Sequence, residues 1–336
     1  MGEIAKRVGA LMASEISEAP GVFSRAVRAD HAARLSLEGI RSIYTIARGS
    51  SDAVANILSY EAMRELGLPV TSLPPSIFSV YDGVAMADSA ALVISQSGAS
   101  PDLLASARGI RAQGGRVVAI TNRPGSAVEC LSDVTIGINA GPELAVPATK
   151  SVIGSVAAGM ALIAALKPEY SAACRQAAAQ MDRVVGKTLL QLDHLRNAIL
   201  QVRNVYVIGR GAGYGAAHEI ALKIKETCAI HAEAYSASEV LHGPLQLATK
   251  PLCVLVLDTC EDLANVSVDK ARKRFAELGA DVHRISPADL GAEKTTPAAA
   301  AALLLYALYP VILSTAIAIG VDPDTPATLS KVTETT

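Results

Sequence analysis

The chain has 336 residues, of which 51% are hydrophobic, 4% are aromatic and none is tryptophan, and its formal net charge is −2. This length accommodates two ordinary domains, and a core with so few aromatics must be built from Ala, Val, Leu and Ile, as in proteins that alternate helices with parallel strands. The near-neutral charge excludes an overall field that attracts nucleic acid or an anionic membrane, so an anionic substrate would need a local site.

The amino-terminal segment and the cysteines favour a cytoplasmic protein. Residues 1–20 carry acidic side chains and no continuous apolar run, so we expect no signal peptide. The five cysteines are an odd number without a C-x-x-C spacing, which favours reduced thiols over a disulfide framework.

The first half of the chain predicts a parallel α/β unit with a phosphate site. β-branched runs begin at Ile43 and Ala91, and each leads into a loop of small residues followed by a helical pattern. Ligands bind beyond the carboxyl ends of such strands, where helix N–H groups point outward. Either loop alone would better fit an ordinary capped helix, but the pair on neighbouring strands favours a phosphate cradle formed without strong positive charge. The proposed cradle residues are Ser50, Ser51, Ser95, Gln96, Ser97 and Ser100.

The second half of the chain repeats the first. "VYVIGRGAG" from Val205 matches "IYTIARGSS" from Ile43, and "CVLVLDTC" from Cys253 matches "ALVISQSG" from Ala91 at the same offset. Strands and helices in the same order twice indicate two tandem domains with parallel sheets, rather than one large sheet.

We expect the first domain to span residues 1–166, including an amino-terminal helical segment. The second domain would span 167–336, with linker helices at its start and a tail at its end. The second copy replaces the seryl loop by "LDTCED", whose carboxylates would repel phosphate. These acidic residues are Asp258, Glu261 and Asp262.

The segment from Lys223 to Leu245 gathers charged groups and histidines among apolar residues. Glu219, Lys223 and Glu226 share one helical face, although an ordinary solvent-facing pair fits Glu219 and Lys223 equally well. The spacings match no zinc motif, so we expect no metal, and a carboxylate with the imidazole of His242 favours proton transfer.

The uncharged segment 295–321 is long enough to cross a bilayer. We interpret it instead as buried helices, broken near Pro310. Together with the apolar segment 151–166, it suggests a two-fold dimer that buries apolar surface.

Several motifs carry a resemblance to a known family. "SQSG" with Ser100, "GPELAVPATKS" at 141–151, "KIKETCAIHAEAY", "EVLHGPL" and "LSKVTETT" occur in this order over nearly the whole chain. The chain resembles the sugar isomerase (SIS) family and, within it, the isomerase half of glucosamine-6-phosphate synthase. The resemblance implies two flavodoxin-like αβα sandwiches. The sequence contains no counterpart of the synthase's glutaminase domain, and its tail lacks the synthase's arginine, so we expect a stand-alone deaminase-type relative.

The resemblance also implies roles for individual residues. Glu226 would move a proton between C1 and C2, His242 would open the sugar ring from the neighbouring subunit, and Lys331 would face the C2 carbonyl or imine. Val146 would line the sugar site, Lys223 would contact substrate, and the seryl loops would hold the phosphate.

The sequence therefore predicts a cytoplasmic homodimer that acts on a hexose 6-phosphate without cofactor, metal, nucleic acid or membrane. The expected reaction converts glucosamine 6-phosphate to fructose 6-phosphate and ammonia. The alternatives are a galactosamine-6-phosphate deaminase, a fructosamine-6-phosphate deglycase and an ammonia-dependent glucosamine-6-phosphate synthase. A non-catalytic sugar-phosphate sensor is the alternative from another class.

Overall fold

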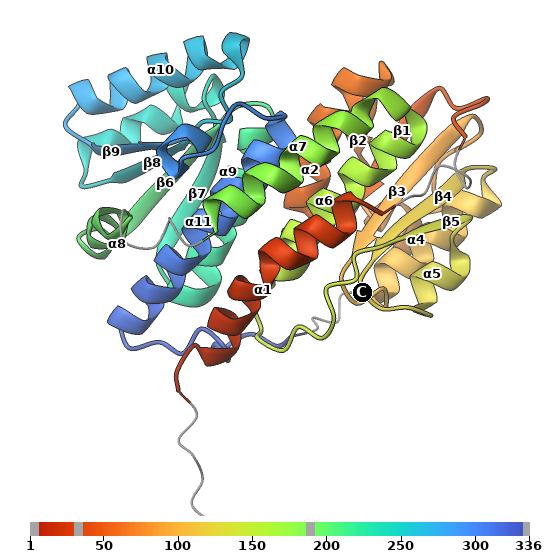
Figure 1. Ribbon diagram of the computed structural model, residues 1–336, viewed down its shortest axis with the longest axis horizontal. Coiled ribbons are helices and arrows are strands. Elements are labelled where there is room, and N and C mark those ends of the chain that lie inside the picture. The colour runs from red at the N-terminus through yellow and green to blue at the C-terminus, as the bar shows by residue number, and fades with distance from the viewer. Residues whose placement is uncertain (1–6, 30–35, 186–191, 332–336) are drawn as a thin grey trace, which may run out of the picture. The chain divides into compact units, whose positions relative to one another are not determined.

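The computed structural model describes residues 7–29, 36–185 and 192–331 of the chain (Figure 1). The chain forms two compact units. The sheet A unit contains Gly21–Gly141 and Ser151–Ala179, and the sheet B unit contains the segment up to Pro20, Pro142–Lys150 and Gln180–Lys331. The predicted division after residue 166 follows the order of the sheets but differs from this grouping, because two earlier segments group with sheet B and residues 167–179 group with sheet A. The last part of the tail motif, Val332–Thr336, lies outside the described residues.

Sheet A has five parallel strands in the order β2-β1-β3-β4-β5. The central strand β3 is buried at every residue, as expected for a parallel sheet that is covered on both faces. The strands are β1 (Ser42–Ile46), β2 (Val70–Ser72), β3 (Ser89–Ser95), β4 (Arg116–Thr121) and β5 (Val134–Gly137).

Helices cover both faces of sheet A. On one face, Leu103, Ala107 and Ile110 of α4 and Val128 of α5 share a core with β3 and β4. On the other face lie α2 and α6 (Figure 1). The helices of this part of the chain are α2 (Ser50–Leu66), α3 (Ser76–Ser79), α4 (Pro101–Ala112), α5 (Ala127–Leu131) and α6 (Lys150–Leu166).

Sheet B has four parallel strands in the order β7-β6-β8-β9. Helix α10 covers one face, where its residue Phe275 packs with Tyr206 and Ile208 of β6. Helices α9 and α11 pack against each other on the opposite face (Figure 1). The elements are β6 (Asn204–Gly209), α9 (Ala212–Cys228), β7 (His231–Ser236), β8 (Cys253–Leu257), α10 (Asp262–Glu277), β9 (Asp281–Ile285) and α11 (Pro297–Ala318).

The strand order confirms the repeat that the sequence predicts. Sheet B reproduces the order of the first four strands of sheet A, and strand β5 has no counterpart among the described residues. The prediction of two parallel, flavodoxin-like α/β domains is therefore confirmed. Three further helices complete the described chain: α1 (Ala10–Val27) near the amino terminus, and α7 (Ser171–Val184) and α8 (Asp193–Leu200) ahead of β6.

The apolar segment near the carboxyl terminus differs from its prediction. It forms one helix, α11, that continues through Pro310, so the expected break is wrong. Among the described helices, α11 alone is long and apolar enough to cross a membrane by length and composition, and 72% of its most apolar window is buried inside the protein. The apolar residues of α6 from Val152 to Ile163 are buried as well. The apolar area of these two helices therefore no longer argues for a dimer.

Candidate active site

A buried lysine lies between two carboxylates on helix α9. Glu219, Lys223 and Glu226 share one face of this helix, as their spacing predicts. The side chains of Glu219 and Lys223 are 0% and 1% exposed, so the solvent-facing interpretation of this pair is wrong. Lys223 Nζ donates a hydrogen bond to Glu226 Oε2 and lies 3.7 Å from Glu219 Oε1.

The two carboxylates keep Lys223 charged despite its burial. Burial alone would lower the pKa of the ammonium, but the negative charges of Glu219 and Glu226 outweigh it and hold that pKa above its usual value. Tyr309 of α11 completes the cluster, because its hydroxyl donates to Glu219 Oε1 at 3.1 Å. Burial, reinforced by the charge of Glu219, raises the pKa of Tyr309 well above its usual value, so the hydroxyl stays a donor.

A second lysine–carboxylate pair joins the 142–150 segment to the carboxyl-terminal tail. Lys331 Nζ lies 3.5 Å from Glu143 Oε2 and donates to the Ala145 carbonyl at 2.6 Å. The other oxygen of Glu143 accepts the Thr149 N–H at 3.0 Å. The Val146 N–H donates to the Asp324 carbonyl, so the tail also holds this segment through its backbone.

The two pairs lie in one electrostatic neighbourhood. The charge of Glu143 adds to those that raise the pKa of Lys223 and of Tyr309. The charge of Glu143 thus links the Lys223–Glu226 pair to Lys331, and the sequence analysis had singled out these residues separately. Sequence reasoning missed Glu143 and Tyr309. Glu143 stands inside the quoted "GPELAVPATKS" motif, whereas Tyr309 gave no signal within its apolar run.

His242 does not join this cluster within its own chain. It follows the short 3-10 helix Glu239–Leu241, is exposed, and lines a hollow with Lys270 and Arg274 of α10. Tyr206, which packs on α10, donates its hydroxyl to the Pro244 carbonyl at 3.1 Å, so the His242 segment lies on the α10 face of sheet B. Glu226 lies on the opposite face with α9. The sheet therefore separates the two side chains.

The seryl loops follow two adjacent strands of sheet A. Ser50 and Ser51 begin α2 after β1, and the segment from Ser95 to Ser100 connects β3 to α4; β1 and β3 pair directly. Ser95 Oγ accepts the Gly98 N–H at 3.0 Å and so serves the loop itself. Ser100 occupies the N-cap position of α4, but its hydroxyl makes no cap hydrogen bond. Ser97 and Gln96 are half-buried in the same loop.

An ion pair, which the sequence analysis missed, joins the two seryl loops. Arg48 Nε, in the loop before α2, donates to Asp102 Oδ2 at 2.7 Å, at the start of α4. The Asp102 side chain is 0% exposed and that of Arg48 is 50% exposed. The expectation of a cradle without strong positive charge is therefore incomplete, although "ARGSS" contained the signal.

In the corresponding loop of sheet B, the polar side chains already bond to one another and to neighbouring residues. Asp258 directly follows β8, accepts the Cys260 N–H at 2.7 Å, and pairs with Arg284 Nε and Nη2 at 2.9 and 2.6 Å. The Thr259 hydroxyl donates to Glu261 Oε1 at 3.0 Å. These carboxylates already use the donors that an anion would need. Phosphate binding in the first repeat stays a prediction.

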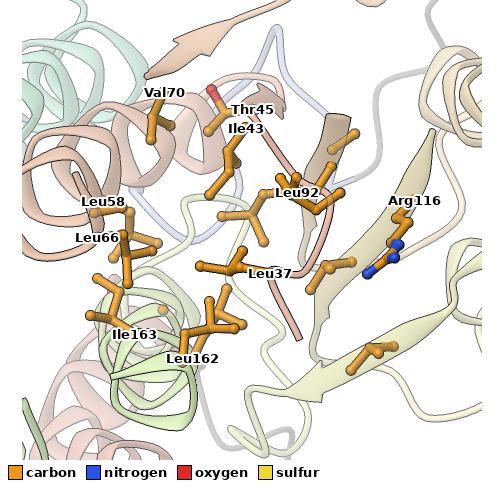
Figure 2. A pocket seen from close by; sticks show the side chains of 18 of the residues that line it. Leu37, Ile43, Thr45, Leu58, Leu66, Val70, Leu92, Arg116, Leu162 and Ile163 are labelled. Atoms are coloured by element: carbon orange, nitrogen blue, oxygen red, sulfur yellow. The ribbon is translucent and has the colours of Figure 1, made fainter. Parts of the chain in front are cut away.

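An apolar cavity of 320 Å³ in the sheet A unit does not suit a sugar phosphate (Figure 2). Leu58 and Leu66 of α2 and Leu162 and Ile163 of α6 face it from one side. On the sheet it lies along the amino-terminal halves of β3 and β4, away from the seryl loops. Its lining offers few donors for hydroxyl or phosphate groups. Among the described residues, no group of three or more His, Cys, Asp or Glu side chains is placed to hold a metal.

Sequence comparison relates the chain to a known family. The family model described as "SIS domain" matches residues 36–165 and 198–288. A glutamine–fructose-6-phosphate aminotransferase (isomerizing) of Pyrobaculum aerophilum is 31% identical over 314 residues, covering 88% of this chain and 52% of that protein. The chain thus spans about half the length of the curated relatives it matches.

Structural comparison gives the same relationship. A protein of Silicibacter pomeroyi DSS-3, described provisionally as a phosphosugar isomerase, has a TM-score of 0.83 and 33% identity, covering 94% of this chain and 99% of that one. The carboxyl-terminal domain of glucosamine-fructose-6-phosphate aminotransferase from Francisella tularensis has a TM-score of 0.84 at 23% identity, covering 97% and 100%. The second match is evidence for the fold alone.

Proposed function

The chain belongs to the SIS domain family, and from that premise we propose that it converts glucosamine 6-phosphate and water to fructose 6-phosphate and ammonia. The observation that carries this proposal is the cluster at the end of α9. Glu226 is a partly exposed carboxylate, at 26%, held by a lysine that is itself buried and charged. Such a group can reach a substrate and still keep a fixed orientation.

In the proposed reaction, a single base first removes a proton from the substrate and then returns it. In the open-chain sugar, the C2 proton is acidic because it is adjacent to the C1 aldehyde. Glu226 removes this proton to give an enolamine and returns it to C1, which leaves an imine at C2. Water then adds to the imine and ammonia leaves, so substrate and water balance ketose and ammonia.

The two lysines have different places in this scheme. Lys223 orients Glu226 through its hydrogen bond and adds positive charge where the enolamine forms. Lys331 is the group that faces the C2 carbonyl or imine. Its bonds to Glu143 and to the Ala145 carbonyl fix its ammonium beside Val146, which we assign to the sugar lining.

The phosphate is assigned to the seryl loops of the sheet A unit. The uncapped hydroxyl of Ser100 and the half-buried Ser97 support this assignment, as does the start of two helices at adjacent strand ends. The same loop in sheet B is filled by its own ion pair.

Ring opening is assigned to His242 of a second copy of the chain. The support is the separation within one chain, where sheet B lies between His242 and Glu226. We therefore propose a homodimer with composite sites because of the position of His242, and not because of apolar area. The five cysteines are free thiols, which supports a cytoplasmic location.

A panel of substrates separates this reaction from its neighbours. Purified protein is incubated with glucosamine 6-phosphate, galactosamine 6-phosphate and fructosamine 6-phosphate, and ammonia release is measured. We expect glucosamine 6-phosphate to be the best substrate. Preferred turnover of fructosamine 6-phosphate would replace the proposal by a deglycase, and binding without any turnover would indicate a sensor. Faster synthesis from fructose 6-phosphate and ammonia would favour the reverse reaction.

Replacing the base tests the mechanism directly. Glu226→Gln keeps the shape of the side chain but cannot take a proton, so kcat should fall by about 10²–10⁴ while substrate binding is retained. The matched control is Glu233→Gln, a carboxylate of β7 that bonds the Tyr235 hydroxyl and lies outside the cluster. The control should keep kcat within about threefold of the parent. A Glu226→Gln variant within tenfold of the parent would show that another group is the base.

A further inference from the structure

Arg48 makes only part of the interactions that its guanidinium allows. Its Nε donates to the buried Asp102 carboxylate at 2.7 Å. Among the described residues, neither of its Nη atoms has a hydrogen-bond partner. Since its side chain is 50% exposed, the two Nη groups are open to a ligand.

Other arginines paired with buried carboxylates use their donors more fully. Arg64 contacts Glu61 through Nη2 and Glu65 through Nε. Arg284, in the repeated loop of sheet B, contacts Asp258 through both Nε and Nη2. Arg64 and Arg284 thus each use two nitrogens to pair with carboxylates, whereas Arg48 pairs with Asp102 through Nε alone. Pairing through Nε alone fixes the Arg48 guanidinium and leaves its two Nη groups available to a ligand.

The available edge lies where other donors gather. Asp102 is the second residue of α4, so the ion pair holds Arg48 at the amino terminus of this 12-residue helix. The backbone N–H groups of Ser97 and Ser100 make no hydrogen bond to a described residue, and the Ser100 hydroxyl makes no cap bond. A helix terminus with open N–H groups attracts an anion, and a guanidinium edge matches two oxygens of a phosphate.

We infer that Arg48 binds the substrate's phosphate through its Nη groups, with Asp102 as the residue that positions it. This assignment rests on the proposed function insofar as the ligand is a phosphorylated sugar. It adds the cationic contact that the seryl loops lack.

Equilibrium binding of inorganic phosphate by calorimetry tests the inference without any turnover. Arg48→Lys retains a charge that can pair with Asp102 but loses the two Nη donors that can bind two phosphate oxygens at once. Phosphate binding should therefore weaken by about tenfold. Arg48→Gln should weaken it further. The matched control is Arg64→Lys, another arginine paired with a buried carboxylate of the sheet A unit, which should leave phosphate binding unchanged. Thermal unfolding of each variant reports whether the fold is intact.

The outcomes separate this inference from the proposed function. Phosphate dissociation constants of both Arg48 variants within twofold of the parent, or no phosphate binding by the parent itself, would overturn the inference and leave Arg48 as the counter-ion of Asp102. If Arg48→Gln does not fold, Arg48→Lys decides. Arg48-dependent phosphate binding without ammonia release from any aminohexose phosphate would uphold the inference while the proposed function fails.

Discussion

Lys223 is an ammonium group that water does not reach, and its stability depends on the carboxylates around it. An isolated buried charge costs several kcal/mol, whereas a paired and hydrogen-bonded one is tolerated. Glu219 and Glu226 supply the opposite charges, and the Tyr309 hydroxyl supplies a donor to Glu219. At this scale, the orientation of Glu226, the proposed base, depends on Lys223, and Lys223 depends in turn on Glu219 and Tyr309.

Tyr309→Phe isolates one of those supporting bonds. The change removes the donor to a buried carboxylate, so we expect the free energy of unfolding to fall by about 1–3 kcal/mol. We also expect kcat to fall several-fold with little change in the Michaelis constant, since Glu219 no longer holds Lys223 as firmly. Denaturant unfolding and steady-state kinetics measure the two effects.

Tyr306→Phe is the matched control for this prediction. Tyr306 lies on the same helix, is half-buried, and its hydroxyl has no hydrogen-bond partner among the described residues. Its removal should change stability by less than about 0.5 kcal/mol. Equal effects of the two substitutions would show that the Tyr309–Glu219 bond contributes nothing.

At the scale of elements, the β3–α4 loop is shaped by its contact with the start of α5. Gly98 has φ +60, and a Cβ atom there would lie 2.2 Å from Ser126 Oγ. The Gly98 carbonyl accepts the Val128 N–H of α5 at 3.0 Å. The loop thus keeps Ser97 and Ser100 in place only while residue 98 has no side chain.

Gly98→Ala should displace this loop. We expect a stability loss of about 2–4 kcal/mol from backbone strain and overpacking and a weaker affinity for phosphorylated sugar. Gly67→Ala is the matched control, because Gly67 has a similar φ of +67 at the end of α2 but open space around its Cβ position. It should cost only the strain of about 1–2 kcal/mol and leave affinity unchanged. Equal affinities of the two variants would contradict a role of this loop in phosphate binding.

At the scale of the whole molecule, the position of His242 supports the proposal that two copies of the chain form each active site. Sheet B separates His242 from Glu226, and α10 and α9 cover the two opposite faces (Figure 1). Local rearrangement of an exposed segment would not move the histidine through a packed sheet. We propose that a second copy of the chain supplies the imidazole, which requires no change of fold.

Mixed dimers test this arrangement. Glu226→Gln and His242→Ala chains, each inactive alone, are co-expressed with different tags and the mixed species is purified. If the histidine acts on the other chain, one of the two sites is intact, and activity should return to about half of the parent dimer. If both groups act within one chain, every site lacks one of them and the mixed dimer stays inactive. A monomer in sedimentation experiments that retains full activity would also contradict the proposal.

Two parallel α/β repeats could be predicted from the sequence, because alternating β-branched runs and apolar helical patterns are local signals that occur twice in one order. Glu226 and Lys223 stood out because charged residues cluster there in a chain with few of them, whereas Lys331 was identified only from the resemblance to the SIS family. The sequence did not determine which charges are buried: a spacing of four residues on a helix fits a solvated pair and a buried pair equally well.

The contacts between distant segments could be identified only in the folded chain. The structure showed that the tail places Lys331 on Glu143, that Tyr309 supports Glu219 and that Arg48 pairs with Asp102. It also kept α11 continuous through Pro310, where local rules predict a break, because burial along the helix outweighs one lost backbone hydrogen bond. Such contacts depend on which surfaces meet after folding, and no pattern of neighbouring residues encodes that choice.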